Sequence, residues 1–177
     1  MAILDRFSPK ELRLVRDQLA EAEILLSHYY CIPGREWPRY PYDVKTLEDL
    51  KGAEIADDAL AMVTRFQYCL ESPPQQPRLR EIFGICLQDH NILATLRRRP
   101  EAMTLEALML YILTHELVHV FRFANFPQQY FIQRELHGEK EKRVHRIASG
   151  ILRERRDPQI ERVLGAYDDY LLEELER

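Results

Sequence analysis

The sequence predicts a single α+β domain, in which helices precede and follow a short mixed sheet of three or slightly more strands. Apolar residues recur at helical spacing before residue 30 and after residue 104, and they alternate with polar or smaller residues in between. The chain has 177 residues, of which 46% are hydrophobic and 31% charged, a balance that suits one globular domain. We expect this domain to span residues 1–177, with its sheet and central helices between about residues 58 and 155.

Charge and cysteine usage argue against several classes of protein. The net charge is −4 and the basic residues are dispersed, so we expect no nucleic-acid partner. Cys31, Cys69 and Cys86 form no CxxC motif, which argues against a disulfide framework and against a cysteine zinc site. The N-terminus lacks the pattern of a signal peptide, and the long apolar segment near residue 110 contains ionisable side chains. We therefore expect a cytoplasmic protein that does not bind a membrane.

The first predicted helix runs from about residue 9 to residue 29. Ser8 is placed to cap this helix, Pro9 suits its first turn, and Glu11 can complete a capping box. Apolar residues then recur three or four positions apart, as one buried face of a helix requires. The stretch of residues 31–43, rich in proline and aromatic residues, predicts a loop.

The middle of the chain predicts a short helix and three strands. Residues 46–52 (TLEDLKG) form the short helix, which its final glycine closes. Residues 60–70 alternate in the manner of a strand, and residues 80–87 (REIFGICL) form a second one. A turn at residues 88–91 (QDHN) leads to a third strand at residues 92–97 (ILATLR).

Three further helices complete the predicted domain. Thr104 caps a helix that carries the apolar segment LMLYILTHELVHVFRF, residues 108–123. A second helix covers about residues 135–155, and Asp157 caps a last helix over residues 158–174. The last helix either docks over the domain or meets a protein partner, and the amphipathic faces of both terminal helices offer a surface for such a partner.

Two histidines and a glutamate lie in the middle of the apolar segment, where ionisable groups are costly to bury without partners. His115, Glu116 and His119 match the motif HExxH. Residues four apart lie on the same face of a helix, so the two imidazoles can converge on one tetrahedral zinc ion. Glu116 lies about 100° further round the helix, where it can reach a water on the metal as a general base without being a ligand.

A third protein ligand is expected on the helix that follows. The candidates along this stretch are Glu135, His137, Glu139, Glu141 and His145. Glu141 and His145 share the buried face that the apolar residues of this helix mark, whereas Glu139 faces water. Glu141 is therefore the best candidate and His145 the runner-up.

The segments HELVH and EKRVHRIASGIL resemble the gluzincin clan of zinc metallopeptidases, whose third zinc ligand is a glutamate on a second helix. Glu141 follows His119 by 22 residues in this chain. The resemblance implies a small zincin-like domain in which His115, His119 and Glu141 hold zinc and Glu116 is the general base.

The resemblance also implies two further features. An edge strand of the sheet is expected to pair with an extended substrate, and residues 91–97 are the candidate. The clan has an aspartate four residues after the glutamate ligand, where it orients a zinc-bound histidine. This chain has His145 at that position, which leaves open whether His145 contacts the metal or the substrate.

We expect a zinc-dependent metallopeptidase that hydrolyses peptide bonds in a peptide or protein substrate. Arg122 shares the helical stripe of the two histidines, and Tyr130 and His137 lie between the ligand helices, so these three could bind substrate or an oxyanion. The alternative is a non-catalytic zinc-binding module, with a regulatory or protein-interaction role and the same fold. Glu116 favours the enzyme, because a purely structural zinc site needs no general base and usually has four protein ligands.

Overall fold

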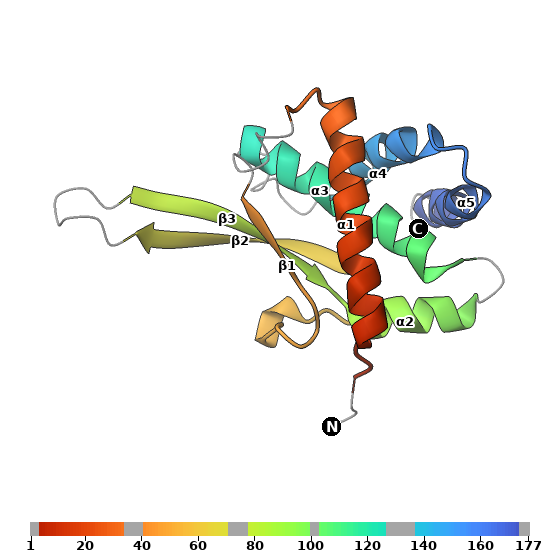
Figure 1. Ribbon diagram of the computed structural model, residues 1–177, viewed down its shortest axis with the longest axis horizontal. Coiled ribbons are helices and arrows are strands. Elements are labelled where there is room, and N and C mark those ends of the chain that lie inside the picture. The colour runs from red at the N-terminus through yellow and green to blue at the C-terminus, as the bar shows by residue number, and fades with distance from the viewer. Residues whose placement is uncertain (1–3, 34–40, 71–77, 100–102, 127–136, 174–177) are drawn as a thin grey trace.

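The computed structural model describes residues 4–33, 41–70, 78–99, 103–126 and 137–173. These residues form five α-helices, one 3₁₀ turn and a three-stranded mixed sheet, which confirms the predicted α+β class (Figure 1). The elements in chain order are α1 (Pro9–Tyr29), β1 (Tyr42–Lys45), η2 (Gly52–Glu54), β2 (Ala61–Leu70), β3 (Arg78–Leu87), α2 (Asp89–Arg98), α3 (Leu105–Asn125), α4 (His137–Arg153) and α5 (Pro158–Glu173).

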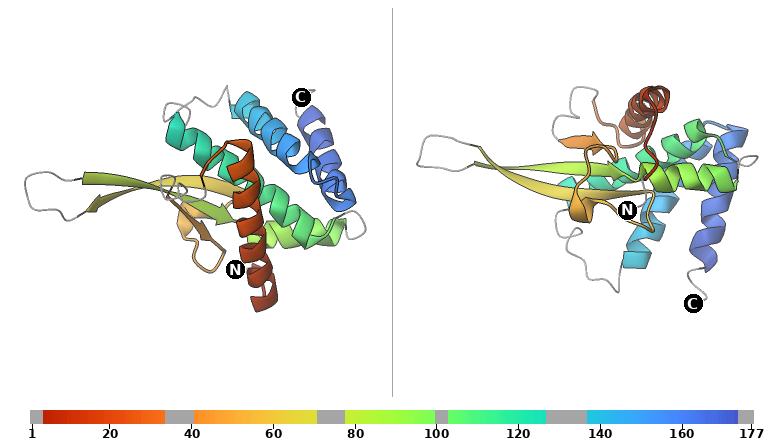
Figure 2. Two further views of the ribbon diagram at one scale, coloured as in Figure 1. Left: turned by 45° about the horizontal axis from the view of Figure 1, so that its top comes forward. Right: turned by 90° about the horizontal axis from the view of Figure 1, so that it is seen from below.

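The sheet has the strand order β1-β3-β2. β1 runs parallel to β3, with Tyr42 opposite Phe83, and β2 runs antiparallel to β3, with Ala61 opposite Leu87. Since β1 is short, the far ends of β2 and β3 continue beyond it as a two-stranded arm that points away from the helices (Figure 1, Figure 2). The other end of the hairpin, where β2 begins, lies against α3.

α3 lies at the centre of the molecule and is enclosed on nearly all sides. Thr104 caps it as predicted, and its hydroxyl oxygen accepts a hydrogen bond from the amide of Ala107 at 3.2 Å. α1 packs across one side of α3, and α4 and α5 pack on another (Figure 1, Figure 2). By length and composition α3 is, in the described part of the chain, the one helix that could cross a membrane, but 78% of its most apolar window is buried inside the fold. A helix that is apolar on every side is typical of a protein core.

Both terminal helices begin where the sequence predicts. At α1 the amide of Glu11 donates to Ser8 Oγ at 3.3 Å and the amide of Ser8 donates to Glu11 Oε2 at 2.6 Å, which completes the capping box. At α5 the amide of Gln159 donates to Asp157 Oδ1 at 2.8 Å. α5 docks on the domain, because its apolar face, which includes Ile160, is buried in the main core. A partner for the outer faces of these helices stays a prediction.

Residues 92–97 form part of helix α2, so the predicted third strand and its role at the edge of the sheet are wrong. The apolar residues of this short run fit either period, and in the helix Ile92 is buried while the leucines after it pack against the core. A buried carboxylate favours the helix, since Asp89 in its first turn accepts hydrogen bonds from the amides of Phe7 and Leu47, each at 3.0 Å. These bonds tie the start of α2 to the segments before α1 and after β1.

The third strand of the sheet is β1, which begins inside the stretch predicted as a loop. Its four residues pair in parallel with β3, and such long-range pairing leaves little trace in the local sequence. Residues 88–91, predicted as a turn, begin α2 instead, with Gln88 as the N-cap residue. The short helix predicted at residues 46–52 is also wrong, because these residues form a turn that leads into η2.

Candidate metal centre

Three side chains that can bind a metal meet between α3 and α4. His115 and His119 lie one turn apart on α3, and Glu141 faces them from α4. Nε2 of His115 lies 3.2 Å from Nε2 of His119 and 3.2 Å from Oε2 of Glu141, and Nε2 of His119 lies 3.1 Å from that same oxygen. Glu139 is exposed, as predicted, and pairs with Lys142 at 3.1 Å. The structure thus brings together the three residues predicted as ligands.

The spacing of these three atoms fits a small tetrahedral cation. Two atoms bound to one zinc ion at about 2.0–2.1 Å lie about 3.3–3.4 Å apart in tetrahedral geometry, close to the 3.1–3.2 Å separations found here. Protons alone fit the cluster poorly. If both Nε2 atoms carry a proton, two donors face each other. If only one carries a proton, the other Nε2 atom and the Glu141 oxygen are two acceptors in contact. If neither carries a proton, all three atoms are acceptors. A cation would instead accept a lone pair from all three atoms.

Aromatic packing holds the two histidine rings in place. The centroid of the His115 ring lies 5.0 Å from that of His119 and 5.9 Å from that of Tyr111, and the His119 ring packs on Phe123 at 5.4 Å. Nδ1 of each histidine is buried and has no hydrogen-bond partner among the described residues. Zinc-bound histidines usually donate this N–H to an acceptor. In the described part of the chain, packing takes over that orienting role.

The cluster shifts the protonation of its own members. Burial alone would raise the pKa of Glu141, but hydrogen bonds from His115 and His119 outweigh burial and hold that pKa well below its usual value. Burial alone would lower the pKa of His115, but the hydrogen bond to Glu141 and the charge of Glu116 raise it. Glu141 is therefore ionised at neutral pH, which is the form that binds a metal.

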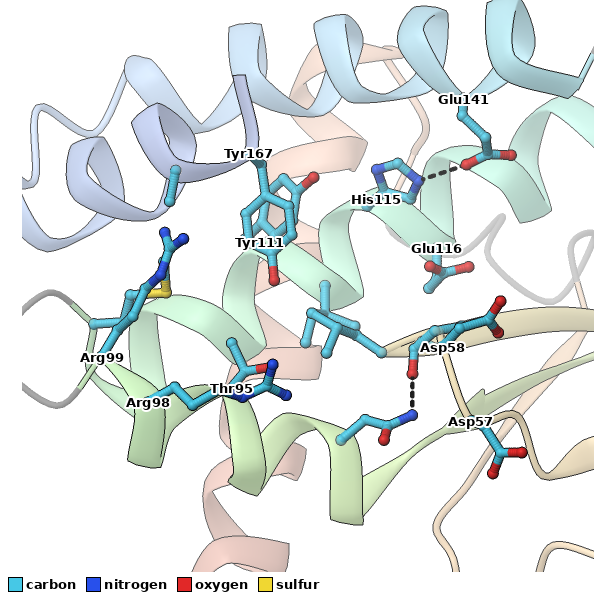
Figure 3. Close-up of a pocket in the computed structure, with 17 residues that line it drawn as sticks. Asp57, Asp58, Thr95, Arg98, Arg99, Tyr111, His115, Glu116, Glu141 and Tyr167 are labelled. Carbon is cyan, nitrogen blue, oxygen red and sulfur yellow. Dashed lines mark hydrogen bonds and ion pairs between the residues drawn. The ribbon is translucent and has the colours of Figure 1, made fainter. Parts of the chain in front are cut away.

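Glu116 faces the cleft beside this cluster. It is 8% exposed, and it forms no hydrogen bond or ion pair with any residue that the structure describes. It lines the same cleft as His115 and Glu141 (Figure 3). Burial raises the pKa of Glu116, and the charges of the two histidines oppose that shift. A carboxylate with a raised pKa and no competing partner is suited to proton transfer near neutral pH.

His145, the runner-up ligand, belongs to a separate network. Its Nδ1 accepts a hydrogen bond from the Tyr111 hydroxyl at 2.9 Å, and its Nε2–H donates to Asp168 of α5 at 2.7 Å. Ser149 Oγ lies 3.2 Å from Nε2, and Arg153 donates to the second oxygen of Asp168 at 2.8 Å. Both ring nitrogens are occupied, so His145 links α3, α4 and α5 and does not join the three converging donors.

Of the remaining residues predicted near the site, only the side chain of Arg122 lies in the described part of the chain. Arg122 is half-buried and is not among the described residues that line the cleft. Burial lowers the pKa of Arg122, as does the charge of Arg143, while Tyr30 opposes the shift. Tyr130 lies outside the described residues, and so does the side chain of His137, whose backbone begins α4. The substrate or oxyanion roles of these residues stay predictions.

A cleft of about 530 Å³ runs from the cluster to the end of α2. Figure 3 shows His115, Glu116 and Glu141 at one end of this cleft and Arg98 and Arg99 at the other. The sequence prediction missed the two arginines, because it placed their neighbours on a strand. In the helix, the residues of α2 that line the cleft recur at helical spacing. Arg98 and Arg99 are the last of them.

The opposite rim of the cleft is the segment between η2 and β2. Asn91 of α2 donates hydrogen bonds to the carbonyl oxygens of Ala56, at 3.0 Å, and Ala59, at 2.7 Å. These bonds hold the intervening residues, Asp57 and Asp58, at the wall of the cleft (Figure 3). The rim is therefore acidic on the side of the cluster and is fixed to the helix that carries the arginines.

Comparison of the chain with protein-family models, with curated proteins and with solved structures finds no match. The chemistry of the site therefore follows from its geometry and from the residues that build it.

Proposed function

We propose that the protein is a zinc-dependent metallopeptidase. The proposal rests on one observation. Nε2 of His115, Nε2 of His119 and Oε2 of Glu141 lie 3.1–3.2 Å from one another, and Glu116 lines the same cleft beside them. The set holds three protein ligands and a separate carboxylate. That arrangement is typical of catalytic zinc sites, whereas structural sites usually have four protein ligands.

His115, His119 and Glu141 would hold the zinc ion through two neutral imidazoles and one carboxylate. Bound zinc would supply a Lewis acid that makes water more acidic and polarises a carbonyl group. Glu116 accepts the proton of the attacking water on its carboxylate and then delivers it to the nitrogen of the departing amine. Its position about 100° round α3 from His115 keeps it out of the donor set, while it still lines the same cleft.

The outer edge of β2 supports the binding of an extended peptide. The order β1-β3-β2 leaves one edge of β2 without a strand partner among the described residues, and β2 begins with Ala61 in the wall of the cleft. A peptide can add to such an edge through backbone hydrogen bonds, which make little demand on its side chains. This edge of β2, and not residues 91–97, would bind the extended peptide.

The variant Glu116→Gln tests the enzyme against the alternative of a non-catalytic zinc module. Glutamine keeps the shape of the side chain but cannot take a proton. We expect the wild type to cleave peptides of a mixed library, detected by mass spectrometry, and the variant to cleave them about 10²–10⁴-fold more slowly with unchanged zinc content. Glu106→Gln is the matched control, because Glu106 is exposed on the first turn of α3.

Two outcomes would contradict the proposal. If neither the wild type nor the control cleaves any peptide while both hold zinc, the non-catalytic module is the better description. If the wild type and Glu116→Gln cleave equally well, the activity belongs to another site or to a contaminant.

A further inference from the structure

The end of the cleft furthest from the cluster carries two adjacent positive charges. Arg98 is the last residue of α2 and Arg99 follows it, and both side chains are exposed at the cleft (Figure 3). Arg98 Nε donates only to its own helix, at the carbonyl oxygen of Ala94 (3.3 Å). Neither guanidinium pairs with a carboxylate of any residue that the structure describes.

The neighbouring Arg97 shows that this pair is not simply a charged helix end. Arg97 points to another side of α2, where it pairs with Asp5, and it does not line the cleft. It already places a positive charge in the last turn of the helix, which is the position that the helix dipole favours. Arg98 and Arg99 add two further charges on the side of the cleft, where a guanidinium can bind a carboxylate through two parallel hydrogen bonds.

The stretch between the arginines and the cluster is aromatic and apolar. Tyr111 and Tyr167 stack in the wall of the cleft with their centroids 4.7 Å apart, and Ile112 lies beside them. The amide of Met103, two residues before α3 begins, donates to the carbonyl oxygen of Arg99 at 3.3 Å, so α3 begins near the arginine end of the cleft. From Leu105 the helix reaches the cluster at His115 about ten helical steps or about 15 Å further on. An extended peptide advances about 3.3 Å per residue, so about four residues span this distance.

We propose that the cleft selects peptides with a carboxylate about four residues from the cleaved bond, and that Arg98 and Arg99 bind this carboxylate. The position of the cleaved bond rests on the proposed function, whereas the carboxylate site itself does not. The carboxylate belongs to an acidic side chain or to the C-terminus of the peptide, since both offer the same two oxygens. Asp57 and Asp58, on the rim near the cluster, repel a carboxylate there and favour the arginine end.

A binding experiment tests the carboxylate site separately from catalysis. Fluorescent ten-residue peptides carry one glutamate at successive positions, with glutamine at the same positions as the control, and a second set compares a free C-terminus with an amide. Binding is measured by fluorescence polarisation to the Glu116→Gln protein, so that the peptides stay intact. The same peptides given to the wild type, with products read by mass spectrometry, place any cut relative to the carboxylate.

We expect the best-placed carboxylate to tighten binding about tenfold at low salt, as two partly exposed arginine contacts would. The double substitution Arg98→Gln with Arg99→Gln should abolish this preference, and Arg97→Gln should keep it. A preference for glutamate over glutamine identifies a side-chain source, and a preference for the free acid over the amide identifies a C-terminal one.

The proposal is overturned if the carboxylate makes no difference at any position, or if the double variant keeps the preference. If the double variant does not fold, the single substitutions Arg98→Gln and Arg99→Gln decide the point, and an unchanged preference in both overturns the proposal. A preference without any cleavage by the wild type would sink the proposed peptidase and leave the carboxylate site standing.

Discussion

Two histidine clusters lie one helical turn apart between the same two helices, and they differ in how fully their polar atoms are paired. Tyr111 and His115 are four residues apart on α3, and Glu141 and His145 are four residues apart on α4. Each cluster therefore has one such residue pair across the helix interface, and in the cluster around Glu141 His119 adds a second contact. Both clusters lie at the interface of α3 and α4, and they differ in the chemistry of the partners.

The cluster around His145 is complete. The Tyr111 hydroxyl donates to one ring nitrogen, the other nitrogen donates to Asp168, and Arg153 pairs with the remaining oxygen of that carboxylate. Every donor meets an acceptor, as in most buried polar networks. Such a network needs nothing further, and it fastens α5 to the core.

The cluster around Glu141 is incomplete. No arrangement of protons satisfies its three mutual contacts, and the second nitrogens of both histidines are buried without a partner among the described residues. Buried polar atoms left in this state cost about 1–3 kcal/mol each. A cation bound by these ligand atoms, as we propose, would satisfy the contacts that protons leave unsatisfied, whereas the neighbouring cluster needs none.

The largest expected effect comes from adding zinc to the cluster around Glu141. Zinc at about a thousand times its dissociation constant should stabilise the folded state by about 4 kcal/mol. For a chain of 177 residues this corresponds to a rise in melting temperature of about 10 °C. Differential scanning fluorimetry, with and without zinc, measures the shift. Glu141→Gln should lose most of it and His145→Ala should keep it, and equal shifts in both variants would mean that zinc binds elsewhere.

A smaller effect is expected when the complete cluster is broken. His145→Ala removes the partner of the buried Tyr111 hydroxyl and leaves a cavity, so the free energy of unfolding should fall by about 2 kcal/mol while zinc content stays unchanged. Urea denaturation gives the value, and His28→Ala, at an exposed position in the last turn of α1, should cost less than about 0.5 kcal/mol. Loss of zinc from His145→Ala would show that the two clusters are not independent.

The smallest expected effect is a dependence of stability on pH. Burial lowers the pKa of His145 below its usual 6.5, while Asp168 opposes the shift and the charges of His115 and Arg153 add to it. The unfolded chain therefore takes up a proton first as the pH falls, so the folded state loses stability below about pH 6.5 until His145 itself is protonated. The difference in melting temperature between the wild type and His145→Gln should shrink from pH 7.5 to pH 5. Parallel curves for the two proteins would contradict this.

The predicted helices were right wherever a cap and a long apolar period agreed. The capping box at Ser8 and the cap at Thr104 fix the starts of α1 and α3, and the helical phase of α4 separates Glu141 from Glu139 without any knowledge of the fold. Local spacing alone therefore picks the HExxH residues and narrows the third ligand to Glu141 and His145, which share one face of α4. Tyr111 could have been added by the same reasoning, since it lies four residues before His115.

The errors lie where a short segment is decided by distant contacts. Residues 92–97 carry too few apolar residues to tell a helix from a strand, and the hydrogen bonds from Phe7 and Leu47 that hold Asp89 come from remote parts of the chain. β1 depends on parallel pairing with β3, and the pairing of His145 with Asp168 depends on how α5 docks. Local sequence contains no signal for these contacts.

The zinc content of the purified protein shows whether His115, His119 and Glu141 form a metal centre. Elemental analysis of wild type prepared without chelators should find about one zinc per chain, and Glu139→Gln, which changes an exposed glutamate on the same helix, should match it. Glu141→Gln should hold well under half of that amount, because it removes one of three protein ligands. A wild type that holds no zinc and takes up none on dialysis, or a Glu141→Gln protein that holds as much as the wild type, would contradict the assignment of this cluster as a metal centre.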